Sequence, residues 1–225
     1  MTAEHGGHDV PPEWRALFRG RAAMLASHRG WDPGALDLAR KLAGALDAPL
    51  VTATVTRLLV DLNRSPHNPR VFSEVTRGLP RGERRGLIER YHRPHWDAVR
   101  GRLQRALRGR GTVLHVAVHS FTPVLAGIRR KPDVALLYDP ARPGERTLVA
   151  AWAPALAAAL PSRCVRRNDP YRGRTDGLPT AMRRELGRGY VGIEIEVNQR
   201  HVGARGRFPA WVPDALLGSL SEALA

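Results

Sequence analysis

The sequence has few of the residues that mark several classes of protein. Cys164 is its only cysteine, so we expect no intrachain disulfide and no cysteine-rich zinc knot. No apolar run approaches the ~20 residues that a membrane span needs. Residues 1–5 have neither the basic nor the apolar stretch of a secretory signal. These absences predict a protein of the reducing cytoplasm with no membrane partner.

Lysine is also nearly absent, which changes the meaning of the strongly basic charge. The net charge of +15 comes from 36 Lys and Arg against 21 Asp and Glu, but only Lys41 and Lys131 are lysine, which leaves 34 arginines. A surface selected for phosphate affinity would have no need to exclude lysine. The arginines are also spread along the chain, without a basic tail. This usage is typical of a GC-rich genome, and we therefore do not expect nucleic acid to be the partner.

Hydrophobic periodicity and turn residues predict a single domain over residues 1–225, in which strands alternate with helices. The expected helices cover residues 32–47, 84–108, 145–160, 177–187 and 213–224. The expected strands cover residues 49–55, 57–62, 112–119, 133–138, 163–166 and 191–197, and residues 66–82 are expected as loop. This alternation predicts an α/β fold of three layers, with a mixed, mainly parallel sheet and helices on both faces. Residues 4–8 are typical of a loop that follows a strand, which leaves open whether a first strand is missing at the N-terminus.

The expected strand at residues 112–119 carries two histidines on one face. His115 and His119 are four residues apart, about 13 Å along a strand, so they cannot bind one metal ion together. His119 lies at the carboxyl end, where α/β folds place their sites. The pattern therefore predicts that His119 is functional and that His115 is a hydrogen-bonded core histidine.

The last expected strand places Glu194, Glu196 and Asn198 on the face opposite its apolar residues. Two carboxylates on one face of an apolar strand are costly to bury unless they are paired or bound to a metal. One interpretation is an edge strand with a solvated face. The other places Glu196, which is nearer the carboxyl end, in a site as a general base.

Two further groups of polar residues are candidates. His5 and His8 flank two glycines, which allow a tight turn near a ligand. Asp32 precedes Pro33, the usual pattern of a helix N-cap followed by the first helical residue.

The other group contains Arg57, Asp61, Asn63 and Arg64, which cluster near the end of an expected strand. Arginine binds a carboxylate through two parallel hydrogen bonds. The alternative is a surface salt bridge. If residues 57–63 form an unbroken strand, Arg57 and Asn63 share a face and Arg64 points to the other one. A turn after Leu62 would bring Arg64 to the same face, and the following Ser65–Pro66 favours such a turn.

Five segments together resemble the N-formylglutamate amidohydrolase family, in the family's order and over nearly the whole chain. They are residues 4–11 (EHGGHDVP), 31–35 (WDPGA), 57–64 (RLLVDLNR), 119–123 (HSFTP) and 194–199 (EIEVNQ). The family is related in fold to the zinc carboxypeptidases. The resemblance therefore implies one α/β domain with helices on both sides of a mixed sheet.

The resemblance also implies one zinc ion, Zn²⁺, bound by His5 and His119. A catalytic zinc usually has three protein ligands and one open position. Zinc carboxypeptidases have a glutamate three residues after the first histidine, where this family commonly has asparagine and this sequence has His8. The resemblance leaves two candidates for the third ligand, Asp32 and, as the alternative, His8.

By the same analogy, Glu196 would be the general base, and Arg57, Asn63 and Arg64 would hold the carboxylates of the substrate. The implied reaction is the hydrolysis of a small anionic N-acyl amino acid. The substrate that the resemblance favours is N-formyl-L-glutamate, which would be cleaved to formate and L-glutamate. One alternative is a related hydrolase of another N-acyl amino acid or a small peptide. Another is a divergent, non-catalytic protein that binds an anionic partner through its basic surface.

Overall fold

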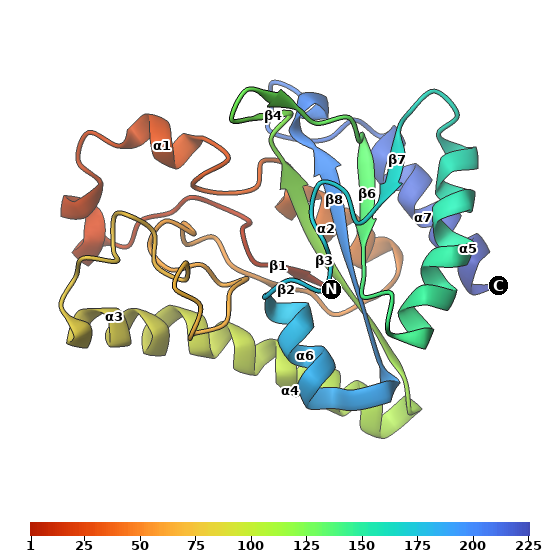
Figure 1. Ribbon diagram of the computed structural model, residues 1–225, viewed down its shortest axis with the longest axis horizontal. Coiled ribbons are helices and arrows are strands. Elements are labelled where there is room, and N and C mark those ends of the chain that lie inside the picture. Colours follow the sequence, from red (N-terminus) through yellow and green to blue (C-terminus); the bar gives the residue numbers. More distant parts are fainter.

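The computed structural model describes residues 1–225, and a six-stranded sheet forms its centre, in the order β2-β1-β3-β8-β6-β7 (Figure 1). The strands are β1 (Thr2–Ala3), β2 (Val51–Thr52), β3 (Val113–Phe121), β6 (Val134–Leu137), β7 (Val165–Arg167) and β8 (Tyr190–Asn198). All neighbouring strands are parallel except β6 and β8, which are antiparallel. The predicted fold class, a mixed and mainly parallel sheet with helices, is confirmed.

Helices cover both faces of the sheet because side chains alternate along its two long strands. On one face, Val116 and Val118 of β3 and Ile195 of β8 belong to the main hydrophobic core. The helices that contribute to this core are α2 (Ala35–Ala45), α5 (Pro143–Ala159) and α7 (Trp211–Leu224). On the other face, α4 (Arg93–Arg110) and α6 (Leu178–Leu186) pack around Tyr190 in a smaller core. His119 and Glu196 point to this second face.

A third part of the chain lies to one side of the sheet, on the left in Figure 1, and has little regular structure. It contains a 3-10 helix (Pro12–Phe18), α1 (Ala22–Ala26) and α3 (Arg81–Leu87). The expected strand at residues 57–62 is wrong, because this segment forms turns here. Its leucines and Val60 are buried in a separate small core with Phe18 and Leu87, which explains why an apolar run resembled a strand.

Two expected helices differ in detail. The helix expected at residues 84–108 begins earlier, at Arg81, and a π-helix (Ile88–His92) joins α3 to α4 without a gap. Asp32 is not the N-cap of α2, because Gly34 takes that position with a φ of 83°. A Cβ at Gly34 would also come within 2.6 Å of the Phe208 ring, so the turn needs glycine. The side chain of Asp32 is thereby left to make other contacts.

The remaining elements are short. A hairpin of β4 (Val124–Leu125) and β5 (Ile128–Arg129) follows β3, and 3-10 helices cover Gly187–Gly189 and Gln199–His201. The expected strand at residues 49–55 is reduced to β2. Thr2–Ala3 form β1 directly before Glu4, so a strand does precede the loop at residues 4–8. None of the helices combines the length and the apolar character that crossing a bilayer requires.

Candidate active site

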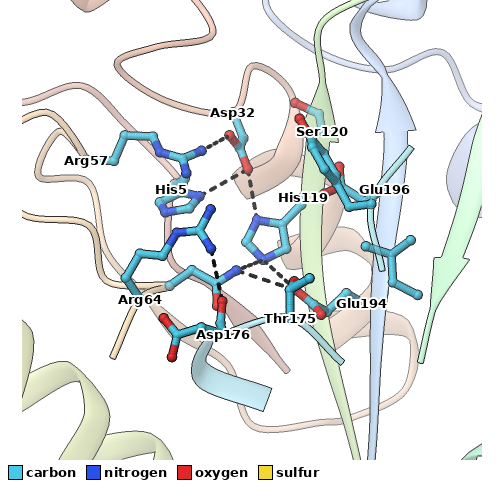
Figure 2. A pocket seen from close by; sticks show the side chains of 14 residues that line it. His5, Asp32, Arg57, Arg64, His119, Ser120, Thr175, Asp176, Glu194 and Glu196 are labelled. Carbon is cyan, nitrogen blue, oxygen red and sulfur yellow. Dashed lines mark hydrogen bonds and ion pairs between the residues drawn. The ribbon is translucent and has the colours of Figure 1, made fainter. Parts of the chain in front are cut away.

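The carboxyl ends of β1 and β3 bring two histidines to the same aspartate. His5 lies two residues after β1, His119 lies near the end of β3, and Asp32 comes from the turn before α2. Oδ2 of Asp32 is 3.3 Å from Nδ1 of His5 and 2.9 Å from Nδ1 of His119 (Figure 2). The two imidazole rings are 5.3 Å apart between centroids. One donor atom from each residue lies within 4.8 Å of the others, so these buried side chains can hold one metal ion.

A carboxylate lies behind each imidazole, on the ring nitrogen that faces away from Asp32. Nε2 of His5 is 2.7 Å from Oδ1 of Asp61, and Nε2 of His119 is 3.2 Å from Oε2 of Glu4. Histidines that bind metals in proteins usually donate their second ring N–H to a carboxylate or carbonyl in this way. The sequence analysis gave Glu4 no role and placed Asp61 only in an arginine cluster. The one local signal for Glu4 is its position directly before His5.

Carboxylates outnumber arginines around the two imidazoles. The largely buried carboxylates are those of Glu4, Asp32, Asp61, Glu194 and Glu196. Arg57 balances part of this charge, since its guanidinium lies 3.3 Å from Oδ1 of Asp32 and 2.8 Å from Oδ2 of Asp61. Buried negative charge is costly without a cationic partner. The excess of carboxylates and the two imidazoles therefore fit a divalent cation, and a His-His-carboxylate set is one that zinc uses in hydrolases.

The two glutamates of β8 differ from the aspartates in their ionisation. Burial would raise the pKa of Asp32, but the neighbouring histidines and Arg57 hold that pKa far below its usual range. Burial raises the pKa of Glu194, and it raises the pKa of Glu196 to about 8. Oε2 of Glu196 has no hydrogen-bond partner within the protein. Glu196 is therefore the carboxyl group at this site that is poised to exchange a proton near neutral pH.

These groups line a pocket of about 130 Å³, and the three residues expected to bind carboxylates line it as well. The guanidinium of Arg57 already pairs with Asp32 and Asp61. Asn63 accepts a hydrogen bond from the backbone N–H of Leu178 at 2.9 Å, and its Nδ2 faces His119 and Glu194. Arg64 reaches the pocket through a turn and donates to the carbonyl of Asp176 at 3.0 Å. Because residues 57–62 are not a strand, strand parity does not decide which of them face the site.

The structure places other candidates outside the pocket. His8 is exposed, its ring lies 5.1 Å from that of Trp31, and it does not line the pocket or belong to the group of possible metal ligands. His115 is a buried core histidine as predicted, hydrogen-bonded to Thr2 at 2.9 Å and to the Tyr190 hydroxyl at 2.6 Å. The edge-strand interpretation of Glu194 and Glu196 is wrong, because β8 lies between β3 and β6.

Sequence reasoning missed one wall of the pocket. The loop between β7 and α6 contributes Tyr171, Thr175, Asp176 and Gly177. The Tyr171 hydroxyl accepts a hydrogen bond of 2.8 Å from Arg130, which follows the β4–β5 hairpin. This loop carries no periodic pattern, so only the tertiary structure brings it to the site.

Comparison with known proteins identifies the family. The model of the N-formylglutamate amidohydrolase family matches residues 1–202. The chain belongs to this family. The family resemblance predicted from the sequence is thus confirmed, and the chain is placed among amidohydrolases, a class of hydrolase.

Two solved structures are similar over almost the whole chain. One is the gene product Atu2144 from Agrobacterium tumefaciens, with a TM-score of 0.81 and 29% identity over 99% of this chain and 88% of that chain. The other is an N-formylglutamate amidohydrolase from Ralstonia eutropha JMP134, with a TM-score of 0.69 and 20% identity over 99% of this chain and 90% of that chain. The second likeness, at this identity, is one of fold. No curated protein matches the sequence.

Proposed function

We propose that the protein is a zinc-dependent amidohydrolase that removes the acyl group from an N-acyl amino acid. The substrate that we propose is N-formyl-L-glutamate, which would yield formate and L-glutamate. The observation that carries the proposal is the convergence of His5, Asp32 and His119 in one pocket with Glu196. The metal would be held by Nδ1 of each histidine and by the carboxylate of Asp32. When bound, zinc supplies Lewis-acid polarisation of the acyl carbonyl and lowers the pKa of water toward 7.

The protein's own groups carry the proton. Glu196 accepts a proton from the attacking water at its unpaired Oε2, and it then gives that proton to the leaving nitrogen of the amino acid. A pKa near neutrality suits both roles, because the same group must act as a base and then as an acid. The guanidinium of Arg57 is held by Asp32 and Asp61 at the wall of the pocket, where it would stabilise negative charge that develops on the carbonyl oxygen.

The arginines support an anionic substrate. Arg64 lines the pocket with its side chain 31% exposed; its Nη1 donates to the carbonyl of Asp176, and its Nε lies 3.9 Å from Asp61, too far for a hydrogen bond. Its guanidinium therefore keeps N–H groups free for a substrate carboxylate. The pocket volume of about 130 Å³ favours a small molecule over a folded protein or a long peptide.

Arg64→Lys is expected to raise KM strongly for N-formyl-L-glutamate and to change KM little for the corresponding neutral N-formyl amide. The reason is that lysine keeps the charge but cannot form the two parallel hydrogen bonds of arginine with a carboxylate. Steady-state kinetics with both substrates measures the difference. Equal losses for the charged and neutral substrates would show that Arg64 supports the loop at Asp176 and does not bind the substrate.

The proposed function is tested by metal analysis and a substrate screen on the same preparation. We expect about one equivalent of zinc per chain and release of formate from N-formyl-L-glutamate. Cleavage of a different N-acyl amino acid or of a small peptide would keep the reaction and change the substrate. A protein that binds no zinc, cleaves none of these compounds and binds nucleic acid in a salt-sensitive way would contradict the proposal.

A further inference from the structure

A second cavity lies beside the helical run that joins α3 to α4, and it shares no residue with the candidate active site. Its volume is about 460 Å³, which is large enough for a small molecule. One wall is the coil at residues 66–72, and the other is the helix at the lower left in Figure 1. Cationic side chains outnumber carboxylates in its lining: His67, Arg81, Arg84, Arg85 and Arg93 against Glu89 alone.

Most of this positive charge has no partner within the protein. The one carboxylate, Glu89, lies 2.8 Å from Arg85, whereas the other three arginines form no ion pair. Nε of Arg84 is also out of contact with solvent and has no hydrogen-bond acceptor. Like charges repel each other, and a buried donor without an acceptor is costly. An anion in the cavity would relieve both costs.

A turn of π-helix brings the last of these arginines to the cavity. Residues at i, i+3 and i+7 share one face of an α-helix, which places Arg81, Arg84 and Ile88 together. After Ile88 the hydrogen bond spans five residues, because the N–H of Arg93 donates to the carbonyl of Ile88. The extra residue puts Arg93, rather than His92, next on that face. Such single π turns are rare and occur frequently at functional sites.

The same turn anchors the opposite wall of the cavity. His92 is buried, and its Nε2 lies 2.7 Å from the carbonyl oxygen of Arg64, directly before the coil. Further along the coil, the guanidinium of Arg84 lies over the ring of Phe72, 5.8 Å from its centroid. The coil and the helix therefore contact each other on two sides of the cavity, so the cavity is formed before any ligand binds.

We propose that this cavity binds a small molecule that carries a diphosphate or triphosphate group. Its four arginines exceed its single glutamate by three charges. Each phosphate group carries about 1.5–2 negative charges at neutral pH, so two or more phosphates match this excess and a single carboxylate does not. The planar guanidinium also binds phosphate oxygens through two parallel hydrogen bonds. The site is separate from the proposed hydrolase reaction.

The test titrates the full chain with inorganic pyrophosphate, ADP and orthophosphate in a calorimeter at low ionic strength. We expect pyrophosphate and ADP to bind at least ~10-fold more tightly than orthophosphate, because a second phosphate adds charge-assisted hydrogen bonds. Tighter binding of ADP than of pyrophosphate would support a nucleotide as the source of the diphosphate. Equal affinities would support the free diphosphate. Absence of binding by both compounds would overturn the proposal.

Variants locate the bound diphosphate. Arg84→Gln combined with Arg93→Gln removes two unpaired charges and should weaken pyrophosphate binding by at least ~10-fold. Arg93→Glu reverses one charge at an exposed position, where little packing is lost, and should weaken binding similarly. The matched control is Arg105→Gln combined with Arg108→Gln. These two exposed arginines lie on α4 outside the cavity, and their loss changes the net charge equally, so the control should keep the affinity.

Three results would contradict the cavity as the binding site. Equal affinity in the wild type and in the Arg84/Arg93 variant, or an equal loss in the control, would mean that only the overall charge attracts the diphosphate. Binding that is kept in the Arg84/Arg93 variant and lost in His119→Asn would place the diphosphate at the candidate active site. Tighter binding of single-stranded RNA than of ADP and pyrophosphate would make this surface a nucleic-acid site. None of these measurements needs hydrolysis, so failure of the proposed function leaves them interpretable.

Discussion

Glu196→Gln is expected to lower kcat by ~10²–10⁴ without changing the zinc content, because glutamine keeps the shape of the side chain and removes its ability to accept a proton. Glu196 is paired in register with His119 across β3 and β8, which places it beside the two histidines. Its Oε2 has no protein partner, so the substitution breaks no hydrogen bond there. Rates of formate release and metal analysis of the same samples provide the measurement.

Glu194→Gln is the matched control for this variant. Glu194 lies two residues earlier on the same face of β8 and lines the same pocket, but its Oε2 accepts a weak hydrogen bond of 3.4 Å from Asn63. We expect a much smaller loss of kcat than for Glu196→Gln. Near-normal turnover in Glu196→Gln with a large loss in Glu194→Gln would assign the base to Glu194.

The pH dependence provides an independent check on Glu196. A general base must be deprotonated, so kcat/KM rises with pH through the pKa of Glu196 in the free enzyme. Burial raises this pKa to about 8 in the protein without metal, and a nearby dication would lower it. The wild type should therefore lose activity toward acid pH, and Glu196→Gln should lack that limb of the profile.

The site residues of the two central strands were predictable because their signals are local. Period-two alternation identifies the polar face of β3 and β8, and the position of His119 and Glu196 near the carboxyl ends follows from the same count. The family resemblance added His5 and the arginines, which short-range patterns leave ambiguous. In the structure, these residues line the same pocket.

The remaining parts of the site depend on contacts between distant segments. Asp32 before Pro33 is the usual pattern of an N-cap, and only the positive φ of Gly34 shows that the helix is capped elsewhere. The apolar run at residues 57–62 predicts a strand, yet it packs into the small core with Phe18 and Leu87. Propensity cannot distinguish these outcomes, because neighbours that decide them, such as Phe18 and Leu87, are distant in the chain.

Asp32→Asn is expected to reduce zinc affinity by more than the ~10–100-fold that loss of an outer partner typically costs, and to abolish most of the hydrolysis. Oδ2 of Asp32 faces Nδ1 of both His5 and His119. The amide of asparagine would place either a nitrogen or an uncharged oxygen at this position, so the metal would lose its anionic ligand. Dialysis against a chelator, followed by zinc titration, measures the loss.

His8→Ala separates the two possible third ligands that the family resemblance implies. His8 is exposed beside Trp31 and does not line the pocket, whereas Asp32 is 3% exposed and touches both histidines. Zinc affinity and kcat should therefore be unchanged in His8→Ala and strongly reduced in Asp32→Asn. If His8→Ala loses zinc while Asp32→Asn keeps it, residues 4–8 must rearrange around the metal to bring His8 inward. In that case Asp32 would serve only to orient the two imidazoles and Arg57.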